Sequence, residues 1–242
     1  MIRVAMKTNT VLLLVCSIAM VLVTGCEIFE IDNYDPPNVK LTGNVVYQGE
    51  SLQLGTDEVT IQLWEEGWQL EGAIVVNVAR DGSYAALLYK GTYNMVFESG
   101  QGPFMMTDDP STGNDTIHIQ LTGNMSKDIE VLPYYMVRNA SISAGGGKVS
   151  ATFGAEKIIT GADEKDIDRA YLFLNKTTFV DRANNIESVN ISGGSIADPN
   201  SISLEADIPE LIPTQSYIFA RVGIRIAGVE DYIYSETVKL NL

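Results

Sequence analysis

Short runs in which apolar residues occupy every second position recur along most of this 242-residue chain. Val59, Ile61 and Leu63 form one such run, and residues 117–121 form another. Successive side chains of a β-strand point to opposite faces, so this pattern buries one face and leaves the other in solvent. No segment has a sustained helical period. The chain is therefore expected to be all-β, with antiparallel sheets.

Pro133-Tyr134-Tyr135 interrupts this pattern and predicts a domain boundary, because proline disfavours the interior of a sheet. The candidate strands before the break are residues 43–47, 59–64, 73–78, 83–88, 92–97, 117–121 and 128–132, and those after it are 137–143, 148–153, 169–174, 188–191, 202–208, 217–225 and 232–242. This spacing predicts two β-sandwich domains, at residues 38–132 and 133–242.

The strongest local signal in the first domain is the segment DGSYAALLYKGTYNMVF at residues 81–97. Asp81-Gly82 predicts a tight turn into one strand, and Lys90-Gly91 predicts a second turn before the next. The segment resembles the prealbumin-like sandwich called the carboxypeptidase regulatory-like domain, as does LTGNVV at residues 41–46. The resemblance implies a non-catalytic accessory module.

In the second domain, LIPTQSY at residues 211–217 resembles the fibronectin type III pattern that leads into the sixth strand. The resemblance implies an immunoglobulin-like sandwich, with Tyr217 in a structural tyrosine corner that bonds nearby backbone. Alternation in the strand that follows predicts that Ile218, Ala220, Val222 and Ile224 face the core, and that Tyr217, Phe219, Arg221 and Arg225 lie on the opposite face.

The N-terminus has the order of a secretory signal: Arg3 and Lys7, an apolar run at residues 11–23, and then Thr24-Gly25-Cys26. This run is shorter than the ~20 residues of a membrane-spanning helix. Residues 23–26, VTGC, resemble a bacterial lipobox. The resemblance implies cleavage of a signal peptide at residues 1–25 and lipid attachment at Cys26. The alternative is an ordinary signal peptide with a coincidental cysteine.

Residues 26–37 are acidic and end in two prolines, which favour an extended tether. The acidic stretch behind Cys26 resembles the surface-export signal of lipoproteins in Bacteroides-type bacteria. It implies a protein that is lipid-anchored to the outer membrane and exposed at the cell surface. The alternative is a solvated linker without an export role.

Charge and cysteine content exclude several classes of function. The chain has 31 acidic and 16 basic residues and a net charge of −15, which repels phosphate backbones, so nucleic acid is not an expected partner. Cys16 lies in the predicted signal peptide and Cys26 at the lipidation site. The mature domains are therefore expected to contain no disulfide and no cysteine metal site.

The chain contains few residues of the types that usually carry out catalysis. His118 is the one histidine, and it falls on the polar side of its strand, so a surface position is expected instead of a general base. We expect neither a cofactor nor an enzyme, although a pair of carboxylates for glycoside hydrolysis stays formally open. The oxygen-rich loops at residues 108–115 and 163–168 are expected to be solvated turns, with calcium binding as the alternative.

An aromatic and acidic cluster is the main candidate binding site. Trp64, Glu65, Glu66 and Trp68 lie within five residues, and Trp64 is in the polar register of its strand. Sugars present C–H faces to aromatic rings and hydroxyls to carboxylates, so these side chains are candidates for a glycan platform. The alternative is packing of the tryptophans within the protein. Residues 104–106, Phe-Met-Met, are expected in a loop that covers the core or docks a partner.

The whole chain resembles an uncharacterised two-domain lipoprotein family of Bacteroides-type bacteria, often encoded beside starch-utilisation-type outer-membrane uptake systems. This resemblance rests on the lipobox and on the two domain patterns. It implies a non-catalytic surface protein that binds polysaccharide or assists nutrient uptake. A scaffold that contacts an outer-membrane transporter complex without binding sugar is the alternative, and an enzyme is a third.

Overall fold

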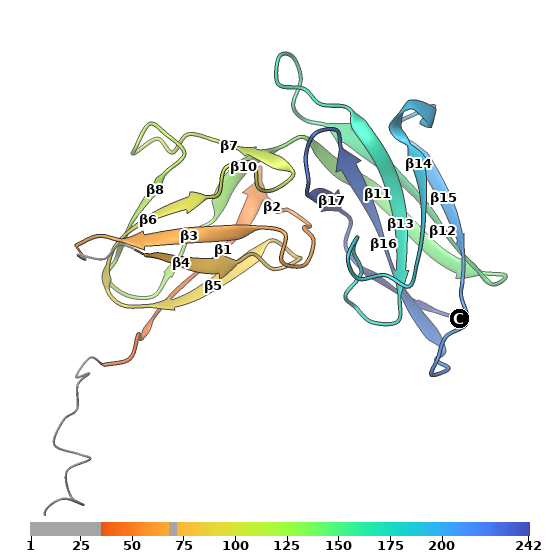
Figure 1. Cartoon of the computed structure of the whole chain (residues 1–242), viewed down its shortest axis with the longest axis horizontal. Coiled ribbons are helices and arrows are strands. Elements are labelled where there is room, and N and C mark those ends of the chain that lie inside the picture. Colours follow the sequence, from red (N-terminus) through yellow and green to blue (C-terminus); the bar gives the residue numbers. More distant parts are fainter. Residues whose placement is uncertain (1–34, 68–71) are drawn as a thin grey trace, which may run out of the picture. The chain divides into compact units, whose positions relative to one another are not determined.

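The computed structural model describes residues 35–67 and 72–242 (Figure 1). The predicted signal peptide, most of the tether including Cys26, and Trp68 lie outside the described residues. Residues 38–242, which contain every described strand, form one compact unit. The all-β prediction is confirmed, since the described residues form strands and a single short 3-10 helix. No helix among them is long and apolar enough to cross a membrane.

Ten strands occupy the first half of this unit, and they form two sheets (Figure 1). They are β1 (Val39–Tyr47), β2 (Glu50–Ser51), β3 (Thr60–Glu65), β4 (Ala73–Asn77), β5 (Ser83–Leu88), β6 (Gly91–Phe97), β7 (Phe104–Met106), β8 (Ile117–Leu121), β9 (Met125–Ser126) and β10 (Ile129–Pro133). One sheet has the order β4-β3-β6-β8. In the other, β1 pairs antiparallel with β2 and β5 and parallel with β9 and β10, while β7 pairs with β10.

Alternation explains how these strands pack. Along β8 the residues are alternately buried and exposed, and along β3 Ile61 and Leu63 are fully buried while their neighbours are not. The buried faces of both sheets contribute to one continuous hydrophobic core. The outer face of the β4-β3-β6-β8 sheet is therefore free to carry polar side chains.

The second half contains eight strands in two further sheets. They are β11 (Tyr135–Gly145), β12 (Lys148–Lys157), β13 (Ile167–Asn175), β14 (Glu187–Ser192), β15 (Ile202–Asp207), β16 (Tyr217–Ile226), β17 (Tyr232–Tyr234) and β18 (Val238–Asn241), with the 3-10 helix η1 (Gly193–Ser195) after β14. One sheet has the order β11-β12-β15. The other has the order β14-β13-β16-β17, with β18 also paired to β16.

The predicted core face of β16 is confirmed, since Ile218, Ala220, Val222 and Ile224 are fully buried. Between β11 and β12, the glycine triplet Gly145-Gly146-Gly147 forms a tight hairpin, where Gly146 and Gly147 have φ of 62° and 79°. Glycine adopts such positive φ values at no steric cost, which explains the triplet as a turn.

Residues 104–106 do not form the predicted loop. They form strand β7, which pairs with β10, and the buried Phe104 ring packs edge-on to Phe97 with 5.4 Å between centroids. The long predicted strand at residues 232–242 is divided into β17 and β18, which both pair with β16, and the short break between them begins with the buried Ser235. Two-residue strands such as β2 and β9 carry too little alternation to be predicted.

The Tyr217 corner also differs from expectation. In the described part of the chain, no hydrogen bond joins the Tyr217 hydroxyl to nearby backbone. Its ring instead packs edge-on to Phe219 at 5.7 Å, and the Lys239 ammonium lies 4.1 Å from the ring centroid. The Gln215 amide donates to the carbonyls of Lys176 and Tyr217 and holds this turn in place of the phenol.

Candidate functional site

The outer face of the β4-β3-β6-β8 sheet brings the predicted Trp64 into a row with two polar side chains. Trp64 of β3 is paired in register with Asn94 of β6, and Asn94 is paired with His118 of β8. Directly paired residues project from the same face of a sheet. The half-buried indole therefore lies beside an amide and an imidazole on the side opposite the core.

Glu66 completes this arrangement from the turn after β3. The Asn94 amide nitrogen donates to Glu66 Oε1 at 3.0 Å, and His118 Nδ1 lies 3.0 Å from Asn94 Oδ1. The His118 and Glu66 side chains remain 46% and 49% exposed. We call Trp64, Glu66, Asn94 and His118 the Trp64 platform. Its polar groups are held in fixed positions and are open to solvent.

The structure separates Glu65 from this platform. Glu65 is paired in register with Tyr93, whose side chain is buried in the core. Burial, together with the nearby Glu65 charge, raises the pKa of the Tyr93 hydroxyl to about 12. Alternation along β3 turns Glu65 to the other face from Trp64. Of the four predicted residues, the structure thus places Trp64 and Glu66 together and Glu65 apart from them, and Trp68 lies outside the described residues.

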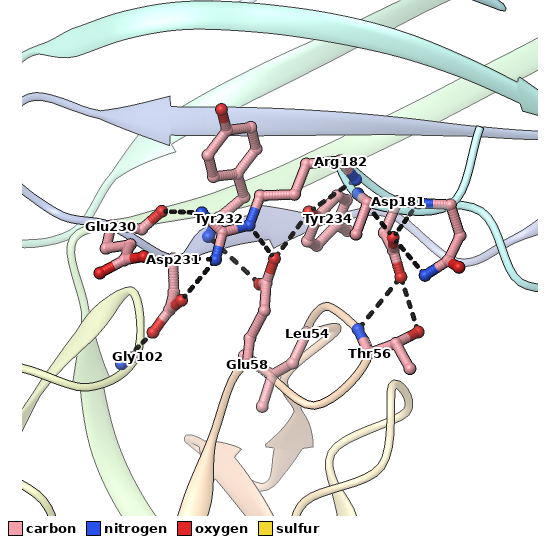
Figure 2. A network of polar contacts seen from close by, with 12 residues as sticks. Leu54, Thr56, Glu58, Gly102, Asp181, Arg182, Glu230, Asp231, Tyr232 and Tyr234 are labelled. Carbon is pink, nitrogen blue, oxygen red and sulfur yellow. Dashed lines mark hydrogen bonds and ion pairs between the residues drawn. The ribbon is translucent and has the colours of Figure 1, made fainter. Parts of the chain in front are cut away.

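Sequence reasoning missed a second polar cluster, which joins the two halves of the unit (Figure 2). Figure 2 shows Arg182 lying between Glu58 and Asp231. The guanidinium lies 2.7 Å from Glu58 Oε1 and 3.3 Å from Asp231 Oδ1. The Glu58 side chain is only 5% exposed. Its burial raises its pKa to about 7, although the Arg182 charge acts in the opposite direction.

Asp181 adds a further link from the residue before Arg182. One Asp181 carboxylate oxygen accepts from the Thr56 hydroxyl at 2.6 Å and from the Thr56 backbone N–H at 3.1 Å. The other oxygen accepts from Asn184. Burial disfavours the charged carboxylate, but these hydrogen bonds outweigh it and lower the Asp181 pKa.

Arg221 is a second fully buried charge in the region where the two halves of the unit meet. It lies on the expected face of β16 but is 1% exposed, because residues from the first half of the chain cover it. Its guanidinium donates to the carbonyls of Ser235 at 2.6 Å and Leu54 at 2.9 Å, and lies 4.4 Å from the centroid of the Tyr234 ring. Burial lowers its pKa to about 10. The guanidinium remains charged at neutral pH and is held by neutral acceptors.

The hydrogen bonds and ion pairs of Glu58 and Asp231 indicate a structural role for these two carboxyl groups. The Glu58 oxygens are engaged by Arg182, the Tyr234 hydroxyl and the Tyr232 N–H, and Asp231 Oδ2 accepts from the Gly102 N–H at 2.9 Å. A glycosidase pair instead needs one carboxyl free to protonate the leaving group and a second free to act as nucleophile or base. Here both side chains are committed to protein partners.

The remaining candidates from the sequence lie on the surface. His118 is exposed, as predicted. In the loop at residues 108–115, Asp109 accepts from the Ser111 hydroxyl and N–H and forms a local turn. Within residues 35–67 and 72–242, no group of three or more His, Cys, Asp or Glu side chains is arranged to hold a metal ion.

Two protein-family models match this chain, one in each half of the unit. Residues 39–132 match the family model described as "Protein of unknown function (DUF3823) N-terminal domain", and residues 135–239 match "Domain of unknown function (DUF3823_C)". A solved DUF3823 family protein from Parabacteroides merdae is 34% identical, with a TM-score of 0.74, over 86% of this chain and 100% of that one. The chain belongs to the DUF3823 family.

Other DUF3823-like structures share this fold. A family protein from Bacteroides ovatus is 30% identical, with a TM-score of 0.73, over 85% of this chain and 100% of that one. A Bacteroides uniformis structure described as a "putative carbohydrate binding protein" is 18% identical, with a TM-score of 0.66, over 85% and 100% of the two chains. At that identity the likeness concerns the fold alone. None of the curated proteins matches this chain.

Proposed function

We propose that this DUF3823 protein is a non-catalytic surface lipoprotein that binds glycan as an accessory component of a starch-utilisation-like nutrient uptake system. The observation that carries the proposal is the Trp64 platform, where an indole lies in register with Asn94 and His118 on an open sheet face. An aromatic ring supplies a surface for a sugar C–H face, and adjacent fixed polar groups supply hydrogen bonds to its hydroxyls.

Two further considerations support this function. The Bacteroides uniformis structure with the same fold is described as a "putative carbohydrate binding protein", and a sugar-binding role on this fold is consistent with the proposal. The buried carboxyl groups Glu58 and Asp231 are committed to protein partners, which favours binding over hydrolysis. Lipid attachment at Cys26 would hold such a binding module at the outer membrane, close to an uptake complex.

Affinity electrophoresis of the purified full chain through gels that contain soluble starch, β-glucan or galactomannan tests the proposal. We expect retardation of the wild type by at least one of them and about tenfold weaker retention for Trp64→Ala, because the stacking surface is lost. A Trp68→Ala variant reports whether the second predicted tryptophan takes part.

Thermal unfolding of each variant checks that the fold is retained. Unchanged retention of Trp64→Ala would reject the platform. Absence of retention by any polysaccharide, together with co-purification of an outer-membrane transporter, would favour the scaffold function instead.

A further inference from the structure

The hydrogen bonds of the Trp64 platform have a defined direction. The Glu66 carboxylate can only accept, so the Asn94 group that lies 3.0 Å from it must be the NH₂. The Asn94 carbonyl oxygen consequently points to His118 Nδ1, also at 3.0 Å. A carbonyl oxygen can only accept, so Nδ1 must carry the proton in this bond. In the neutral imidazole, Nε2 is then left as an acceptor.

The charged group left for a ligand is a carboxylate, and it lies beside a neutral acceptor. The second Glu66 oxygen and His118 Nε2 offer lone pairs, and about half of each side chain is accessible. The platform residues include a carboxylate but neither lysine nor arginine. A ligand that brings hydrogen-bond donors is favoured at these two acceptors, whereas a carboxylate or sulfate group would meet the like charge of Glu66.

We infer that the Trp64 platform selects neutral, hydroxyl-rich glycans and discriminates against glycans that carry uronate or sulfate groups. This inference rests on the proposed function and specifies its ligand class. Sugar hydroxyls donate to Glu66 and His118 Nε2, while a C–H face of the same sugar packs on Trp64. The net charge of −15 acts in the same direction over longer distances.

The test measures retention of the purified full chain in native gels that contain neutral polysaccharides (soluble starch, β-glucan, galactomannan) or anionic ones (polygalacturonate, chondroitin sulfate). We expect the wild type to be retarded by a neutral polysaccharide and not by the anionic ones. His118→Phe keeps a planar ring but removes the Nε2 acceptor. It should weaken retention by roughly 2- to 10-fold, which corresponds to the loss of one ligand hydrogen bond.

Phe179→Ala is a matched control for the aromatic substitution. Phe179 is 52% exposed and lies against Arg80 in the loop before β14, outside the platform. Its removal should leave retention unchanged, and thermal unfolding should show that His118→Phe and Trp64→Ala stay folded at the assay temperature. Retention that falls for both Trp64→Ala and His118→Phe, but not for Phe179→Ala, would support the inference.

The outcomes distinguish this inference from the proposed function. Equal or stronger retention on polygalacturonate or chondroitin sulfate, lost in Trp64→Ala, would overturn the ligand class and leave glycan binding standing. Retention that is lost in Trp64→Ala but unchanged in His118→Phe would overturn the acceptor argument. No retention on any polysaccharide would contradict both.

Discussion

Glu58 is a buried carboxyl group at the contact between the two halves of the unit, and its protonation affects the stability of the fold. It accepts from the Tyr234 hydroxyl at 3.2 Å and pairs with Arg182, but the cost of burying its charge raises its pKa to about 7. A raised pKa means that the folded state binds the proton more tightly than the unfolded chain. The stabilisation is full below the ordinary carboxyl pKa near 4.5 and is lost as the pH rises through about 7.

Glu58→Gln is therefore expected to change the pH dependence of stability. The free energy of unfolding of the wild type should fall relative to that of the variant between pH 5 and pH 8, by up to about 3 kcal/mol. Urea unfolding of both proteins at each pH measures this difference. Glu230→Gln, which removes an exposed carboxylate near the same arginine, is the control. A constant difference between wild type and Glu58→Gln across this range would contradict the prediction.

Strand β16 shows how far the sequence determines the elements of this fold. Its period-two pattern correctly predicted which residues enter the core, because alternation is a local property. The same pattern placed Arg221 on the opposite face, where a charged residue is normally solvated. Its burial depends on Leu54, which lies 167 positions away in the sequence, so no local pattern indicates it. Glu58 and Arg182 were missed for the same reason.

The Trp64 platform could be predicted from the sequence only in part. Trp64 and Glu66 are two residues apart on one extended segment, so alternation puts them on the same face. The same rule puts Glu65 on the other face. Asn94 and His118 join them only through strand register, which depends on which strands pair and on their alignment. Without that information, His118 could be placed on a polar face but not beside Asn94.

Replacing the buried Arg221 of β16 tests whether it couples the two halves of the unit. Arg221→Met should lower the free energy of unfolding by roughly 3 kcal/mol, because the carbonyls of Leu54 and Ser235 lose a charged donor while they stay buried. It should also make residues 39–132 and 135–239 unfold in separate transitions. Urea unfolding followed by tryptophan fluorescence and by circular dichroism measures both effects.

The matched control is another arginine of the same strand. Arg225 is partly exposed and pairs with Asp168 at 3.3 Å, so Arg225→Met should cost less than about 1 kcal/mol. Equal losses for the two variants, or a single coincident transition in Arg221→Met, would show that Arg221 does not couple the two halves.

For the whole molecule, the proposed location rests on Cys26, outside the described residues. Several acyl chains at ~0.8 kcal/mol per buried methylene would hold an acidic protein to a membrane despite its charge. Cys26→Ser should therefore move the protein from the membrane to the soluble fraction of a cell lysate. Cys16→Ser, a change within the predicted signal peptide, is the control and should leave membrane association intact. Membrane retention of Cys26→Ser would reject the lipid anchor.

The pairing of β1 determines how the described strands would respond to a force applied at their N-terminal end. Any pull transmitted through residues 35–37 reaches β1 first, since this strand begins at Val39. β1 is bonded to β5 along six consecutive residues and also to β2, β9 and β10. These bonds run across the strand, so a force along its axis loads them in shear and must break many of them together. If the chain is anchored through Cys26 as proposed, the first strand behind the anchor would resist extension when a bound polymer pulls on the protein.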